Sequence, residues 1–432
     1  MKKIFLTLIF IIIFNQYAFA VTLSEALLQA YKNNLELNAE RENIEVSKED
    51  LKISKSEFLP SVTITGSKSE ENTEKLTNRS GSSAAITDVN PKTKSITVEQ
   101  TIFQGFSGIA SVKKNKIGLD LAKAKLLKIE QETLYKAIEA YSGLVLANEK
   151  LSINQKNISL LERQVETDQA RLERGQITLA DLAQSESSLA GAQANFIQAK
   201  NENITAKLIY EEVIGPIVNP DSLNKNSDIN LKIPFSLDKA IEFSKNNNPN
   251  IIIAKLEYEQ SEKDIIIARS DLSPSATLSL SSTETDDLNS TYDERDKETI
   301  TATISWPIFQ GGKSIASLNK SKNIKNRKKL LFENAVRNNN TNVASAWSNF
   351  QSSKSLLDSV QLQVKAAEIA NEGISIEYES GLGRSTLDVI QSNSILLNSK
   401  IALANSERNY LLAQFKLLQS IGFLKSDYLK LQ

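Results

Sequence analysis

The chain has 432 residues, with 51 lysines and arginines against 52 aspartates and glutamates, and it contains no histidine and no cysteine. The missing side chains exclude imidazole general bases, the commonest zinc ligands, thiol nucleophiles and disulfides. The balanced charge gives no broad positive field for nucleic acid, so none is expected as a partner. Because no glycine-rich phosphate loop is present either, we expect no cofactor and no enzymatic activity.

The N-terminus has the pattern of a secretory signal. Lys2 and Lys3 precede the apolar run Ile4–Phe14, and an Ala-Phe-Ala motif ends at Ala20. This pattern predicts a signal peptide over residues 1–20 that is cleaved after Ala20. The alternative is an uncleaved anchor, but the run is shorter than the roughly 20 apolar residues that span a bilayer. A lipid anchor on the mature N-terminus would need a cysteine.

The chain reads as two copies of one plan. The segments "TLSEAL", "FLPSVTITGS", "IFQG" and "EEVIG" recur in the same order as "SLDKAI", "LSPSATLSLSS", "IFQG" and "LLQSIG". A period this long indicates an internal duplication and not a short solenoid repeat. We expect a first structural repeat over 21–215, a proline-rich linker over 216–235, a second repeat over 236–422, and a C-terminal tail over 423–432.

Each copy begins with two helices. The first helix starts at Thr22, which forms a capping-box pattern with Glu25, and its counterpart starts at Ser236. The second helix is expected over 36–56 in the first copy and over 250–270 in the second. A proline follows each of these second helices and stops it.

Strand pairs follow, near 60–103 and near 274–307. Val62 and Ile64 alternate with hydroxyl residues in one strand, and Ile96, Val98 and Ile102 alternate with polar residues in the next. The segments "ATLSLSS" and "TITATISW" repeat this alternation in the second copy. The period of two predicts four strands, each with one apolar face and one hydroxyl-rich face. Long polar loops are expected over 68–94 and 283–298.

Proline-free segments of helical character complete each copy, over 105–215 and 311–422. The first helix of each segment is expected to be about 70 residues long, or roughly 105 Å. Spaced leucines alternate with alanine, serine and asparagine, so the apolar seam is narrow. Such a seam suits long antiparallel helices that lie side by side in a coiled-coil tube.

A similar turn interrupts both helical segments, as "RLERGQITLADLA" and "YESGLGRSTLDVI". A hydroxyl residue three positions before an aspartate is the capping-box pattern, and the glycine before it suits the end of the preceding helix. The turn residues are Gly175, Thr178 and Asp181 in the first copy, and Gly381, Gly383, Ser385 and Asp388 in the second.

Aromatic residues stand at both borders between strand and helix, namely Phe103, Phe106, Trp306 and Phe309. One interpretation is an aromatic girdle at a membrane interface. The alternative is ordinary packing where the sheet meets the helices.

Taken together, the duplicated motifs "TLSEAL", "FLPSVTITGS", "IFQG", "AYSGLVLA" and "GRSTLDVI" make the chain resemble the TolC family of outer-membrane factors. The resemblance implies a mainly α protein with β: a long antiparallel α-helical coiled-coil barrel plus a transmembrane β-barrel that three protomers share, with four strands each. Four strands cannot close a barrel alone, and open edges in lipid leave backbone groups unpaired, so the strand count also favours a homotrimer.

The resemblance also implies a function. Such a homotrimer sits in outer-membrane lipid and extends into the periplasm as a passive exit duct. It carries drugs or secreted proteins from an inner-membrane pump of the RND or ABC type, through a periplasmic adaptor (membrane fusion) protein. The alternative is that this chain is itself a periplasmic coiled-coil adaptor, which would share the signal peptide and the long helices.

In the family the two turns lie at the periplasmic aperture. The position that matches Asp388 contributes a ring of carboxylates there, whereas Gln391 stands where a second acidic ring would fall. The links that close the aperture involve the positions that match Asp181, Arg384 and Tyr378. The simpler interpretation is that Asp388 only caps a helix and that Arg384 is a solvated loop charge.

Overall fold

The structure is a computed structural model that describes residues 21–431, apart from positions 73, 76, 78, 83–87, 218–219, 221–222, 226–228, 230, 290–291 and 382. The predicted signal peptide lies outside the described residues. The chain forms two compact units, and each unit takes segments from both halves of the sequence. One comprises Met1–Asn38, Ile129–Asn248 and Asn340–Gln432, and the other comprises Ala39–Lys128 and Pro249–Asn339.

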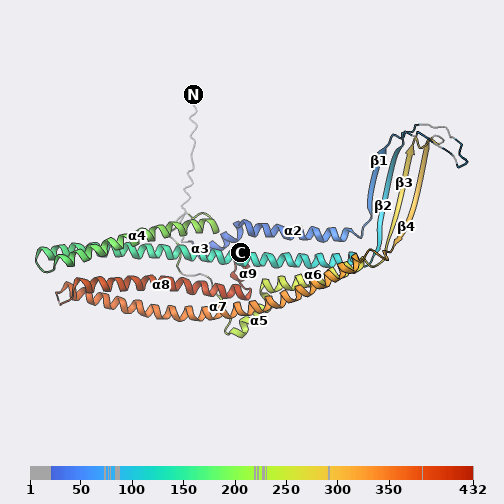
Figure 1. Ribbon diagram of the computed structural model, residues 1–432. Coiled ribbons are helices and arrows are strands. Elements are labelled where there is room, and N and C mark those ends of the chain that lie inside the picture. Colours follow the sequence, from blue (N-terminus) through green and yellow to red (C-terminus); the bar gives the residue numbers. More distant parts are fainter. Residues whose placement is uncertain are drawn as a thin grey trace, which may run out of the picture. The chain divides into compact units, whose positions relative to one another are not determined.

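The first unit consists of two long antiparallel helical hairpins with short helices beside them. Helix α3 (Ser107–Glu173) turns into α4 (Leu179–Val213), and α7 (Lys313–Glu379) turns into α8 (Thr386–Ile421) (Figure 1). The short helices are α1 (Leu23–Asn33), α5 (Leu237–Asn247) and α9 (Ser426–Leu429). The main core lies where these elements meet, and its fully buried side chains include Leu23, Leu27, Leu134, Ile138, Leu144, Tyr210, Phe415 and Leu418.

Local sequence signals explain how the helices of this unit begin and end. Thr22 and Glu25 form the predicted capping box at α1, and the Ser236 side chain caps α5 by accepting from the Lys239 amide. Helix α8 ends at Gly422, whose φ is 84°. A side chain at this glycine would overlap the backbone of Asn247, so only glycine fits this approach.

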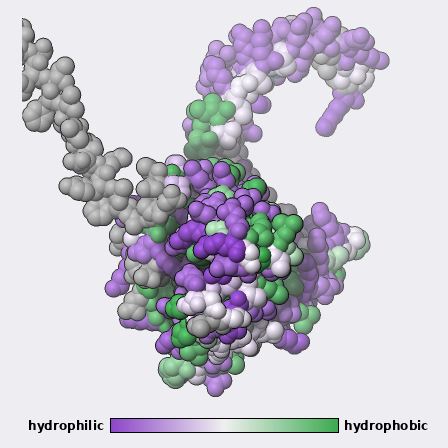
Figure 2. All heavy atoms as spheres, turned by 90° about the vertical axis from the view of Figure 1, so that its left-hand side faces the viewer, coloured by the Kyte–Doolittle hydropathy of each residue, from purple (hydrophilic) through white to green (hydrophobic). Residues whose placement is uncertain are grey.

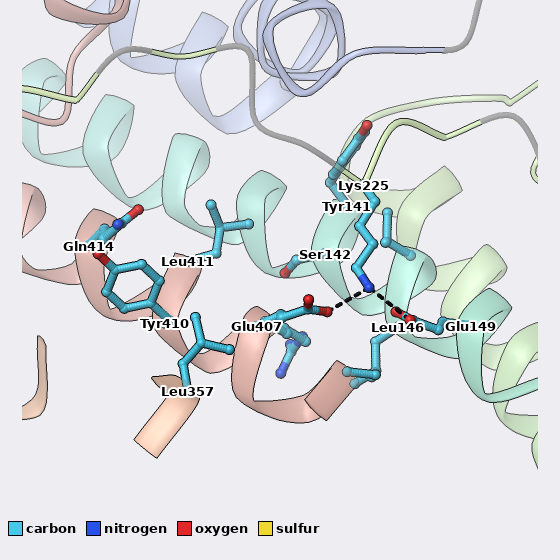
Figure 3. Close-up of a pocket in the computed structure, with 13 residues that line it drawn as sticks. Tyr141, Ser142, Leu146, Glu149, Lys225, Leu357, Glu407, Tyr410, Leu411 and Gln414 are labelled. Atoms are coloured by element: carbon cyan, nitrogen blue, oxygen red, sulfur yellow. Dashed lines mark hydrogen bonds and ion pairs between the residues drawn. The ribbon is translucent and has the colours of Figure 1, made fainter. Parts of the chain in front are cut away.

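The described part of the linker is tied to the hairpins by polar contacts. The Tyr141 hydroxyl of α3 lies 2.8 Å from the Val21 carbonyl oxygen and 2.9 Å from that of Asn224. Lys225 places its ammonium 2.7 Å from Glu149 of α3 and 2.6 Å from Glu407 of α8, inside a cavity of about 370 Å³ (Figure 3). The linker therefore joins one helix of each hairpin through a single lysine.

The helical part of the second unit contains α2 (Leu35–Ser56), α6 (Pro249–Ser270) and the first parts of α3 and α7. Ion pairs join α6 to its neighbours. Lys114 of α3 lies 2.7 Å from Asp264, and Lys328 of α7 lies 2.7 Å from Glu257. Among the described residues, no helix is both long enough and apolar enough to cross a membrane.

The sheet of the second unit has four antiparallel strands in the order β1 (Ser61–Lys68), β2 (Lys92–Gln104), β3 (Ser275–Asp286) and β4 (Glu294–Ser305). The β2–β3 pairing joins the strand pairs of the two halves of the sequence. The register sets Val62, Val98, Leu280 and Ile300 in one row across all four strands. Because directly paired residues share a face, the predicted alternation places the apolar side chains of all four strands on one face of the sheet.

Two details differ from the sequence-based expectation. The prediction of a long loop over 283–298 is wrong, because β3 continues to Asp286 and β4 begins at Glu294. Backbone pairing extends these strands despite their charged side chains, down to the pair Asp286–Glu294. In β2 the register shifts between Thr101 and Phe103, so that Phe103 pairs with Ala276 and Ile102 is the extra residue of a bulge.

Candidate functional site

Both hairpins of the first unit turn through the same local structure. In the first turn the Thr178 hydroxyl accepts from the Asp181 amide, and the Asp181 carboxylate accepts from the Thr178 amide at 2.9 Å. In the second turn Ser385 and Asp388 make the same reciprocal pair, also at 2.9 Å. The predicted capping boxes at α4 and α8 are confirmed. The preceding glycines of these turns have left-handed φ angles, 69° at Gly175 and 73° at Gly381.

The caps change the acidity of the two aspartates. Hydrogen bonds from the Thr178 backbone and then from its side chain hold the pKa of the Asp181 carboxyl below its usual value. The Ser385 backbone and side chain do the same for the pKa of Asp388, and the charge of Arg384 lowers it further. Both carboxylates therefore stay ionised at neutral pH, each beside the positive N-terminal end of its helix.

A buried carboxylate lies a short distance from the turns. Asp168 of α3 has no solvent exposure, and it accepts hydrogen bonds from Gln164 at 3.0 Å, from the Ser185 hydroxyl at 2.5 Å and from the Tyr378 hydroxyl at 2.5 Å. The Tyr378 hydroxyl also lies 3.0 Å from that of Thr386. The network thus draws side chains from α3, α4, α7 and α8 to one point, and it joins the two hairpins.

Arg171 supports the same contact from above the tyrosine ring. Its guanidinium carbon lies 4.1 Å from the ring centre of Tyr378, and its Nη2 donates to the Tyr378 carbonyl oxygen at 2.9 Å. Burial, followed by the hydrogen bond to Asp168, raises the pKa of the Tyr378 hydroxyl. The hydroxyl therefore remains a donor to Asp168 at every pH at which the protein is expected to work.

A polar groove of about 900 Å³ lies beside this network. Three arginines face it, Arg171, Arg174 and Arg384, and both capping motifs border it. Figure 2 looks onto the hairpin ends, where hydrophilic surface surrounds smaller hydrophobic patches. Such a surface suits contact with water, ions and a polar protein partner.

The structure places the predicted aperture residues in three different settings. Arg384 is exposed and forms an ion pair of 2.6 Å with Glu377. Asp388 is half-buried in its cap, and Gln391 is exposed about one turn further along α8. Asp181 makes its hydrogen bonds to Thr178.

Tyr378 differs from the other predicted aperture residues, because it is buried and its hydroxyl donates to Asp168 of the same chain. Sequence reasoning did not single out Asp168. The sequence does indicate that this aspartate is buried, because Asp168 continues the coiled-coil seam spacing of Ile158, Leu161 and Val165. An ionisable side chain at a seam position needs a buried polar partner, but the sequence does not say which one.

The aromatic residues at the strand borders are on the surface of the second unit. Phe309 is 86% exposed and Trp306 is 60% exposed, whereas Phe103 is 37% exposed and packs edge-on against Phe106. The Trp306 indole donates to the Leu272 carbonyl oxygen at 3.2 Å. Exposed aromatic rings of this kind are common at membrane interfaces, and the aromatic girdle stays a prediction.

Two antiparallel helical hairpins and a four-stranded sheet are also the architecture of outer-membrane proteins whose structures have been solved. The structure of VceC from Vibrio cholerae superposes with a TM-score of 0.79 over 93% of this chain and 96% of that one, at 17% identity. BepC from Brucella suis biovar 1, an outer membrane efflux protein, is 28% identical over 97% of this chain and 89% of its own. AprF from Pseudomonas aeruginosa, an alkaline protease secretion protein, is 21% identical over 98% of this chain and 89% of its own.

The family model of outer membrane efflux proteins matches residues 26–209 and again 240–423. The chain belongs to this family, which is the TolC family that the sequence motifs indicated. It is therefore an outer-membrane channel protein and not an enzyme. The family and the relatives fit a channel better than the alternative of a periplasmic adaptor.

Proposed function

We propose that three copies of this chain form a passive exit duct across the outer membrane and the periplasm. The observation that carries this proposal is the sheet, which has one apolar face and two open edges, β1 and β4. Open edges within lipid would leave backbone groups unpaired, at several kcal/mol each. Three sheets of four strands give a closed barrel of twelve, an even number within the usual range.

The two halves of the chain have matching roles in this proposal. Each half supplies a strand pair to the barrel and one hairpin to the periplasmic tunnel, as expected of an internal duplication. The matching of the family model to both halves supports this division. Trp306 and Phe103 would lie at the periplasmic interface of the outer membrane, where the apolar face of the sheet ends.

The duct is one part of an export system, with a periplasmic adaptor and an inner-membrane pump as its partners. The polar groove at the hairpin ends is the surface that we assign to the adaptor. The pump is of the RND or the ABC type. The relatives point to both kinds of cargo, since one is named for efflux and another for secretion of alkaline protease.

The hairpin ends form the gate of the duct. Three copies of Asp388 around the threefold axis would make one ring of carboxylates, and Gln391 leaves the next position neutral. The Tyr378–Asp168 contact holds the two hairpins of one protomer together, and Arg384 is exposed and free to reach a neighbouring protomer in place of Glu377. The gate is therefore polar and is opened by breaking hydrogen bonds and ion pairs.

The test is to extract the protein from outer membranes, determine its mass in detergent, and reconstitute it in planar bilayers. We expect a heat-resistant trimer that conducts ions. A monodisperse monomer that is stable in water without detergent would overturn the proposal, as would a trimer that gives no conductance after the gate contacts are removed.

A further inference from the structure

The cavity of about 370 Å³ that Lys225 borders has no role in the proposed duct (Figure 3). Its lining comes from α3, α7, α8 and the linker, and all of these segments belong to the first unit. Sites for small molecules commonly have volumes of about 300–1,000 Å³, so this cavity is near the lower end of that range. It is large enough for a small organic molecule.

One cationic group of the cavity has no partner. The Nε atom of Arg408 on α8 is buried, and it makes no hydrogen bond to any residue that the structure describes. The guanidinium lies against α3, because a side-chain carbon placed at Gly143 would be 3.9 Å from its Nη2. A buried N–H group without an acceptor costs free energy, and this cost is larger when the group is charged. An acceptor from outside the chain would remove it.

The other charged groups of the cavity are already paired with one another. Lys225 lies 2.7 Å from Glu149 and 2.6 Å from Glu407. Together with Arg408 the lining holds two cations and two carboxylates. The two carboxylates would repel a doubly charged anion, and the two cations would repel a cationic ligand. A ligand with a single negative charge therefore suits the unpaired guanidinium best.

The rest of the lining favours a ligand with an apolar body. Figure 3 shows Tyr410, Leu411 and Leu357 beside Glu407, and Val145 and Leu146 of α3 also line the cavity. A few polar groups among apolar and aromatic side chains are typical of small-molecule sites. Among singly charged groups, a carboxylate matches the planar N–H donors of a guanidinium, which it can accept in pairs.

We propose that this cavity binds a small organic monocarboxylate. The carboxylate lies on the guanidinium of Arg408, and the apolar body lies against Leu357, Tyr410 and Leu411. The bound molecule would contact α3 of one hairpin together with α7 and α8 of the other, so it would stabilise the contact between the hairpins. The site is separate from the sheet and from the hairpin turns, and it does not depend on the proposed trimer.

Four probes that share one ring test the charge of the ligand. Phenylacetate is the expected ligand, whereas 2-phenylethanol is neutral, phenethylamine is a cation, and phenyl phosphate is a dianion at about pH 8, above its second pKa of roughly 6. Each is added to the purified full-length protein in a non-ionic detergent, and binding is measured by equilibrium dialysis against detergent alone. We expect phenylacetate to bind on the order of tenfold more tightly than the other three probes, and to raise the melting temperature.

Three variants test the position of the ligand. Arg408→Met keeps the length of the side chain and removes its charge, so it should weaken phenylacetate binding on the order of tenfold and leave that of 2-phenylethanol unchanged. Leu357→Trp adds volume within the cavity and should weaken the binding of both probes. Lys400→Met removes a cation of the same helix that pairs with Glu368 outside the cavity, and this control should change neither.

Several results would overturn the site. They are equal affinities for phenylacetate and 2-phenylethanol, no binding of phenylacetate, tighter binding of phenyl phosphate, or affinities that Arg408→Met or Leu357→Trp leaves unchanged. If Arg408→Met does not fold, Arg408→Lys decides the question, because lysine keeps the charge but lacks the planar pair of donors. Phenylacetate should then bind several-fold more weakly than to the wild type, and an unchanged affinity would contradict a carboxylate held by the guanidinium.

Discussion

The Tyr378 hydroxyl donates to the fully buried carboxylate of Asp168 over 2.5 Å, and this contact joins α7 of one hairpin to α3 of the other. Together with the hydrogen bond from Arg171 to the Tyr378 carbonyl oxygen, this contact holds the two hairpins together near their turns. The network is fully satisfied, since Gln164, Ser185 and Tyr378 all donate to the same carboxylate. A satisfied buried polar network is rigid and specific, which suits a closed state that must not leak.

Loss of this contact should loosen the gate. Tyr378→Phe removes one donor and leaves Asp168 with two, so we expect it to destabilise the hairpin ends by roughly 1 kcal/mol. Combined with Arg384→Ser, it should raise the single-channel conductance in planar bilayers. Tyr292→Phe, at an exposed tyrosine beside the sheet, is the control and should leave conductance unchanged. Unaltered conductance of the double variant in intact trimers would contradict the gate.

The two capping aspartates should differ in function although their local structures match. Asp388→Asn should reduce the preference for cations and relieve most of the block by multivalent cations, because three carboxylates at a narrow neck attract them. Asp181→Asn removes the same charge from the equivalent cap of the first turn, and it is the comparison at a position outside the proposed carboxylate ring. If both variants lower stability equally and neither changes selectivity, the two residues are only helix caps.

Restoring a second acidic ring should strengthen the block. Gln391 lies about one helical turn beyond Asp388 on α8, so Gln391→Asp would add three more carboxylates near the first three. We expect multivalent cations to block this variant at lower concentrations than the wild type, measured as the concentration that halves conductance. Gln391→Asn, which adds no charge, is the control. An unchanged blocking concentration would show that residue 391 does not face the neck.

The caps make the hairpin ends sensitive to acid. The folded protein lowers the pKa of Asp181 and of Asp388, so each carboxylate stabilises the fold above its usual pKa, and this stabilisation is lost as the pH falls through the lowered value. Amide hydrogen exchange in the two turns, corrected for its intrinsic dependence on pH, should therefore become faster as the pH falls through this value. In the double variant Asp181→Asn with Asp388→Asn, this exchange should be faster at neutral pH and should respond less to acid.

The lysine of the linker should act as a brace between the hairpins. Lys225→Met leaves Glu149 and Glu407 without their shared cation, so we expect a modest loss of stability, on the order of 1 kcal/mol, because the group is partly exposed. Burial lowers the pKa of Lys225, but the hydrogen bonds to Glu149 and Glu407 outweigh this effect and leave the pKa raised. The brace should therefore persist below the usual lysine pKa and fail only in strong alkali. A melting temperature of Lys225→Met equal to that of the wild type would show that the ion pairs are energetically neutral.

Local chemistry allowed much of this protein to be predicted from its sequence. The capping boxes at Thr22, Thr178 and Ser385 depend on residues three positions apart, so the sequence alone determines where α1, α4 and α8 begin. The alternation in "SVTITGS" and "TITATISW" depends only on neighbouring residues, and it correctly predicts the apolar face of the sheet. The duplicated motifs, taken together, also indicated the family, which no single motif could have done.

The tertiary structure decided what depends on distant partners. The strands β3 and β4 extend through a polar segment expected to be a loop, because backbone pairing across the hairpin outweighs the weak strand preference of its charged side chains. The bulge at Ile102 arises only in the pairing of β2 with β3. Asp168 and Tyr378 are 210 positions apart, and nothing local to either residue specifies the other. Their contact exists because four helix surfaces meet at one buried point, where a carboxylate must find its donors.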